Sequence, residues 1–67
     1  MAMTMWVNGH AYEHDRLSLH DLLTQLNLHQ QRVAIEVNGD VIPRSQHRDF
    51  FVHDGDRIEI VRAIGGG

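Results

Sequence analysis

The chain has 67 residues, and because a chain of this size buries only about 60% of its unfolded surface, we expect one small domain. Hydrophobic residues make up 42% and charged residues 22% of the sequence, a composition typical of a globular protein. The formal net charge of −3 argues against a nucleic-acid binder, which normally presents a basic surface to the phosphates.

The first predicted element is a β-hairpin. In Met3–Val7, Met3, Met5 and Val7 share one parity, the period-two pattern of a half-buried strand, which places Trp6 on the opposite face. Asn8-Gly9 follows, and this dipeptide favours a type I′ turn, in which both central residues have positive φ. We expect the returning strand over residues 10–14.

One helix is predicted after the hairpin. Ser18 is the expected N-cap, and Asp21 lies in the first turn, where a negative charge favours the positive end of the helix dipole. We expect the helix to end near Leu28. Four leucines fall on one helical stripe: Leu19, Leu22, Leu23 and Leu26.

Three strand-like pieces follow the helix. Val33, Ile35 and Val37 alternate with other residues before an Asn38-Gly39 turn. A short strand at residues 41–42 must end at proline 43, which cannot donate a ladder hydrogen bond. The polar residues 44–49 are predicted to be irregular.

The last strand is expected over residues 57–63. Asp54 and Asp56 flank a glycine before it and are interpreted as turn residues. Within the strand, Ile58 and Ile60 share one face, and Val61 and Ala63 share the other.

This order of elements predicts an α+β fold of the β-grasp (ubiquitin-like) type, with a mixed four- to five-stranded sheet and one main helix packed on one face. The first and last strands would lie side by side and parallel in the middle. A ferredoxin-like fold would require two helices, and an SH3-like barrel would not accommodate the leucine stripe. We expect the domain to span residues 1–64 and a flexible tail to span residues 65–67.

The tail consists of Gly65, Gly66 and Gly67. Glycine loses the most backbone entropy on ordering and has no side chain to bury, so these residues add nothing to stability. They are either a frayed terminus or a thin tail that carries the terminal carboxylate into a narrow active site of another protein. A side chain in such a tail would block a tight channel.

Short motifs ahead of the tail carry a family resemblance. In chain order they are Val37-Asn38-Gly39, Val41-Ile42-Pro43-Arg44, Asp54-Gly55-Asp56 and Ile58-Glu59-Ile60-Val61. Their order and spacing before Gly66-Gly67 resemble the ThiS family, the sulfur carrier of thiamine thiazole biosynthesis. The similarity covers nearly the whole chain.

The resemblance implies a protein co-substrate rather than an enzyme. In that family a ThiF-like adenylyltransferase uses ATP to adenylate the C-terminal glycine carboxylate, which then becomes a thiocarboxylate with sulfur from a donor such as a cysteine desulfurase. A ThiG-like thiazole synthase receives the sulfur. Carried onto this sequence, Gly67 bears the reactive carboxylate, with Gly66 and Gly65 as slim neighbours, and no cofactor is bound tightly.

Cysteine is absent from the chain, which excludes disulfides, thiolate nucleophiles and Cys-type zinc sites. Sulfur could therefore be carried only as a terminal thiocarboxylate.

A small apolar patch beside the tail is the expected docking surface, because ubiquitin-like proteins often bind partners through that face. The predicted partner-binding residues are Val61, Arg62, Ala63 and Ile64.

Other functions stay open. Within the same fold, the small subunit of molybdopterin synthase also ends in Gly-Gly and carries a thiocarboxylate, although it is usually somewhat longer. From another class, the chain could be a ubiquitin-like modifier that forms isopeptide bonds or a β-grasp interaction module.

Histidine is abundant in this short chain, but the spacing gives no HxxxH pair on the helix and no metal site is predicted. We interpret the histidines as scattered surface residues: His10, His14, His20, His29, His47 and His53.

No apolar stretch approaches the ~20 residues of a membrane span, and the first residues do not form a signal peptide. We expect a soluble cytoplasmic protein.

Overall fold

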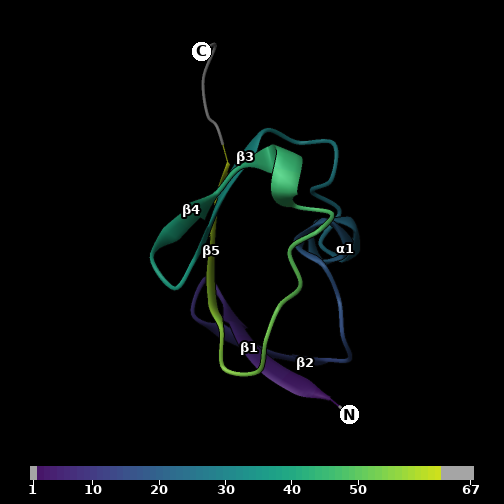
Figure 1. Cartoon of the computed structure of the whole chain (residues 1–67), viewed down its shortest axis with the longest axis vertical. Helices are drawn as coiled ribbons and strands as arrows, with labels where there is room; N and C mark the ends of the chain where they lie inside the picture. Colours follow the sequence, from purple (N-terminus) through teal and green to yellow (C-terminus); the bar gives the residue numbers. More distant parts are fainter. Residues whose placement is uncertain (1, 63–67) are drawn as a thin grey trace.

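A mixed five-stranded sheet is covered on one face by a single α-helix (Figure 1). The computed structural model describes residues 2–62. Its elements are β1 (Met3–Val7), β2 (His10–His14), α1 (Leu19–Gln25), β3 (Val33–Val37), β4 (Asp40–Ile42), the 3₁₀ helix η1 (Arg44–Gln46) and β5 (Arg57–Arg62). The strand order is β2-β1-β5-β3-β4, with β1 and β5 parallel and the other neighbours antiparallel. The predicted β-grasp architecture is confirmed.

Both predicted Asn-Gly turns are present. Asn8-Gly9 joins β1 to β2 with φ angles of 49° and 84°, and Asn38-Gly39 joins β3 to β4 with φ angles of 52° and 91°. Positive φ at both central residues matches the right-handed twist of the flanking strands. The two turns therefore set the register of the two hairpins.

The helix α1 begins as predicted and ends earlier. The hydroxyl of Ser18 accepts a hydrogen bond from the Asp21 backbone amide, and the Asp21 carboxylate accepts one from the Ser18 amide, both at 3.1 Å. At the other end Asn27 has a φ of 62°, and the amide of Leu28 donates to the carbonyl of Leu23 at 2.8 Å. This left-handed cap stops the helix at Gln25, so the predicted end near Leu28 is wrong.

The described part of the chain contains no helix that is both long and apolar enough to cross a membrane.

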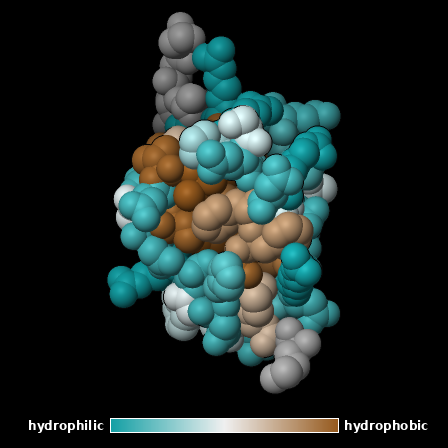
Figure 2. Space-filling view, in the orientation of Figure 1, coloured by the Kyte–Doolittle hydropathy of each residue, from teal (hydrophilic) through white to brown (hydrophobic). Residues whose placement is uncertain are grey.

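The hydrophobic core lies between α1 and the sheet. It contains alternate residues of the strands and the leucines of the helix: Met5, Val7, Leu17, Leu19, Leu22, Leu23, Ile35, Val37, Val52, Ile58 and Ile60. In Figure 2 apolar side chains also reach the surface near β4 and along the middle of the view, within a largely hydrophilic surface. On the other face of the sheet, Trp6 is 41% and Val61 59% exposed.

The polar segment after β4 is more ordered than predicted. It begins with η1 and continues into His47, which is buried and lies with its Nε2 atom 3.0 Å from the carbonyl oxygen of Ile42. In the tautomer with a proton on Nε2, the ring donates to that carbonyl, so the buried Nε2 atom has a hydrogen-bond partner. The interpretation of all six histidines as surface residues is therefore wrong for His47.

Candidate functional site

The strand β5 leads to the C-terminal residues and is held on both sides. Val7 of β1 lies beside Ile58 in the parallel pair, and Ile35 of β3 lies beside Ile60 in the antiparallel pair. Both isoleucines are buried against the helix. The described part of the chain therefore ends on the central strand of the sheet, on the side where β3 begins and η1 lies (Figure 1).

Asn8 fixes β5 beyond the end of β1. Its backbone amide donates to the carbonyl of Ile58 at 2.9 Å. Its side-chain Oδ1 accepts from the amide of Ile60 at 2.7 Å, and Nδ2 donates to the Ile60 carbonyl at 3.2 Å. The carboxamide thus replaces a peptide group and extends the parallel ladder.

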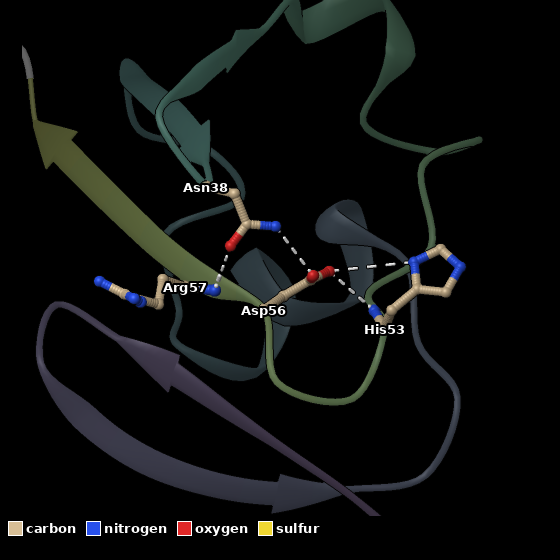
Figure 3. Close-up of polar contacts among 4 residues, drawn as sticks. All are labelled: Asn38, His53, Asp56 and Arg57. Atoms are coloured by element: carbon tan, nitrogen blue, oxygen red, sulfur yellow. Dashed lines mark hydrogen bonds and ion pairs between the residues drawn. The ribbon is translucent and has the colours of Figure 1, made fainter.

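Asn38 fixes the beginning of the same strand (Figure 3). Its Oδ1 accepts from the backbone amide of Arg57, and its Nδ2 donates to Oδ1 of Asp56, both at 3.0 Å. Oδ2 of Asp56 accepts from the His53 amide at 2.8 Å and lies 3.9 Å from the Nδ1 atom of the His53 ring. Asp54 lies within the turn and Asp56 closes it through the His53 amide, so the interpretation of both as turn residues is confirmed. Asp54 also accepts from the Thr4 amide at 2.8 Å.

The face of the sheet opposite α1 exposes apolar side chains on four strands. Val61 of β5 pairs with exposed Ala34 of β3, while Trp6 and Val41 are exposed on β1 and β4. We call this surface the outer face, defined by Trp6, Ala34, Val41 and Val61. Exposed apolar side chains on four strands offer a surface that a partner protein could cover.

Two carboxylates lie on the same outer face. Glu36 of β3 is directly opposite Glu59 of β5 in the antiparallel register. Like charges at opposed positions destabilise a sheet. Within residues 2–62 neither glutamate forms an ion pair with a basic side chain.

A groove of about 320 Å³ lies at the end of β5. Its lining combines short apolar side chains with three guanidinium groups: Arg32, Val33, Ala34, Arg44, Val61 and Arg62. The Nη2 atom of Arg62 also lies 3.4 Å from Oε1 of Gln31. The two predicted partner-binding residues that the structure describes, Val61 and Arg62, are both exposed and meet in this groove.

Sequence reasoning missed the other residues of the groove. Val33 and Ala34 arrive there through the antiparallel register of β3 with β5, in which Val33 pairs with Arg62. Arg44 lies in the groove because β4 ends at residue 42 and the chain turns after proline 43. The remaining predicted site residues, Ala63, Ile64, Gly65, Gly66 and Gly67, and the boundary between residues 1–64 and 65–67, lie outside the described residues.

Metal binding finds no support in the described part of the chain, since residues 2–62 contain no group of three or more histidine or acidic side chains arranged to hold a metal ion.

Residues 5–67 match the sequence profile of the ThiS family. The chain belongs to the ThiS family. A crystal structure of the thiamine biosynthesis protein ThiS from Geobacter metallireducens superposes with a TM-score of 0.82 at 35% sequence identity, over 97% of this chain and 100% of that one. The fold and the family thus agree over almost the whole length.

Two relatives connect the ThiS family to named proteins. The sulfur carrier protein ThiS of Escherichia coli is 38% identical over 50 residues, which are 75% of this chain and 76% of that protein. A thiazole synthase of Paramagnetospirillum magneticum is 39% identical over 51 residues, 76% of this chain but only 16% of that longer protein. A ThiS-like segment is therefore present within that thiazole synthase.

Proposed function

We propose that this chain is a sulfur carrier for thiazole formation in thiamine biosynthesis and acts as a co-substrate of partner enzymes. The observation that carries the proposal is the family match over residues 5–67, which includes the terminal glycines. The 38% identity to a sulfur carrier protein and the agreement of the whole fold with a thiamine biosynthesis protein support it.

The proposed chemistry takes place at the carboxylate of Gly67. A carboxylate is a poor electrophile, so one of its oxygens first attacks the α-phosphorus of ATP on a ThiF-like adenylyltransferase, and pyrophosphate leaves. A hydrosulfide then attacks the acyl carbon, and AMP leaves with the carboxylate oxygen. The product is a thiocarboxylate, which carries transferable sulfur without a cysteine side chain.

The central position of β5 supports a role for the residues that follow it. The side chain of Asn38 holds this strand at its first residue, Arg57, and the side chain of Asn8 holds it at Ile60. We propose that partners dock on Val61, Arg62, Ala63 and Ile64, and that the groove and the outer face extend this contact. The partner then receives the tail in a fixed position relative to a rigid domain.

A thiazole synthase of the ThiG type is the proposed sulfur acceptor, and a cysteine desulfurase is the proposed type of sulfur donor. The segment of the Paramagnetospirillum thiazole synthase that matches this chain supports the first of these two partners.

Mass spectrometry of the intact protein tests the function. The chain is incubated with a ThiF-like enzyme, ATP and sulfide, and we expect its mass to increase by the difference between one sulfur and one oxygen atom. Fragmentation should locate the change at Gly67. A chain that lacks Gly66 and Gly67, and so no longer ends in Gly-Gly, is the matched control and should stay unmodified. Modification at any other residue would contradict the proposal.

A further inference from the structure

A second cavity, of about 250 Å³, lies beside α1 and η1, at the side of the sheet that the helix covers. Five basic side chains line it: His20, His29, Arg44, His47 and Arg48. They come from the helix, from the segment between α1 and β3, and from the segment that begins with η1. The fold therefore gathers three of the six histidines and two of the six arginines around one cavity.

The charge of this cavity differs from that of the whole protein. The chain carries nine acidic residues and a net charge of −3, yet no carboxylate is among the described residues that line the cavity. Neither Arg44 nor Arg48 forms an ion pair with another residue in the range 2–62. The nearby carboxylate of Asp21 accepts from the Ser18 amide instead. Two guanidinium groups are thus available to an anion.

The imidazoles give the cavity buried polar atoms. Nδ1 of His29 is buried and has no hydrogen-bond partner among the described residues. A buried polar atom without a partner costs free energy, so this imidazole of the cavity wall is not held by a hydrogen bond at Nδ1 within the described part of the chain. The ring of His47 is buried and held through its Nε2 atom by the Ile42 carbonyl, so its position is fixed before any ligand binds.

We propose that this cavity binds a phosphate group. Guanidinium groups bind phosphate oxygens through paired, charge-assisted hydrogen bonds. A phosphate monoester offers three strong acceptor oxygens, whereas a carboxylate offers two, and the N–H donors of the Arg44 and Arg48 guanidinium groups are sufficient for the larger number. The ligand is either free phosphate or the phosphate of a small ester such as a nucleoside monophosphate. This site is separate from the sulfur chemistry at the tail and does not depend on it.

A titration followed by NMR tests the site. The ¹⁵N-labelled full chain is titrated with inorganic phosphate at constant ionic strength, with chloride as the exchanged anion. We expect saturable shifts of the backbone amides of His20, His29, Ser45, His47 and Arg48. AMP should produce saturable shifts of the same amides. Tighter binding of AMP identifies an ester as the ligand, and equal binding identifies free phosphate.

Two arginine variants form a matched pair, because each removes one positive charge. Arg48→Gln removes a guanidinium that lines the cavity and should raise the Kd for phosphate about tenfold or more. Arg57→Gln removes an exposed guanidinium at the beginning of β5 and should leave the Kd unchanged. Unchanged thermal unfolding of both variants shows that each is folded.

Three results would overturn the proposal. Shifts that rise linearly with phosphate would show screening of charge without a site. Equal weakening by Arg48→Gln and Arg57→Gln would show a general effect of net charge. Acetate that binds as tightly as phosphate would show that the cavity does not recognise the phosphate group.

Discussion

The side chain of Asn8 forms two hydrogen bonds with the backbone of Ile60, although the two residues are 52 positions apart. The bond from the Ile60 amide is short, at 2.7 Å. Asn8 also has a φ of 49°, which its turn requires. One residue therefore closes the first hairpin and ties it to the strand that leads to the C-terminal residues.

Asn8→Gly separates these two roles, because glycine accepts positive φ but has no carboxamide. We expect the variant to lose about 1–3 kcal/mol of stability, since the part-buried amide and carbonyl of Ile60 lose their hydrogen-bond partners. Asn8→Ala should lose more, because alanine is also strained at this φ. Urea unfolding measures both. If Asn8→Gly is as stable as the unchanged chain, the two side-chain bonds contribute nothing.

Shortening the tail should separate stability from function. A chain without Gly66 and Gly67 should unfold at nearly the same temperature, because these residues have no side chain to bury, and it should fail to transfer sulfur. Leu22→Ala is the converse variant and should cost about 2–5 kcal/mol, because Leu22 is buried in the core. Scanning calorimetry and the mass assay measure the two effects. A large loss of stability on shortening would show that the glycines are structural.

Local patterns were sufficient to predict most of the fold. Alternation in Met3–Val7, the leucine stripe and the two Asn-Gly turns each depend on residues close together in the chain. The parallel central pair follows because a single helix must connect the first hairpin to the later strands.

Contacts between distant segments could not be predicted in this way. The sequence indicates that Asn8 suits a turn, but its bond to Ile60 depends on the register between β1 and β5. The burial of His47 depends on a carbonyl of β4 that lies five residues earlier, within a segment whose composition is polar. The helix stops at Gln25 because Asn27 is left-handed, a role that asparagine fills less often than glycine.

The capping box of α1 predicts a response to acid. Hydrogen bonds to Ser18, first from its backbone amide and then from its side chain, lower the pKa of Asp21 below its ordinary value of 3.8. A lowered pKa in the folded state means that the carboxylate stabilises the fold above the pKa of the unfolded chain, about 3.9. That stability is lost as the pH falls through the lower, folded-state pKa.

Asp21→Asn should therefore be less stable than the unchanged chain at neutral pH, by about 0.3–1 kcal/mol for a carboxylate in the first turn of a helix. The difference should shrink as the pH falls below about 4. Asp49→Asn, at an exposed position outside α1, is the control and should show no such trend. Urea unfolding at several pH values measures the effect, and a difference that does not change with pH would contradict the assignment.

Under the proposed function, the tail must be narrow enough to enter the active site of the adenylyltransferase. Gly66→Val adds a branched side chain next to the reactive residue. In a narrow channel this side chain must either clash or hold the Gly67 carboxylate away from ATP, and a displacement of about 1 Å can lower a rate ~100-fold. The outer face around Val61 is not altered, so affinity for the adenylyltransferase should persist while ATP–pyrophosphate exchange falls.

Val61→Asp is the complementary variant, because it places a charge on the exposed apolar part of the outer face and leaves the tail intact. We expect it to weaken binding of the adenylyltransferase in a calorimetric titration. At saturating carrier, its exchange rate should approach that of the unchanged chain, whereas saturation should not rescue Gly66→Val. Two variants that act on affinity and on turnover separately would show that docking and threading are distinct steps. Exchange by Gly66→Val at the unchanged rate would show that the tail does not pass through a constriction.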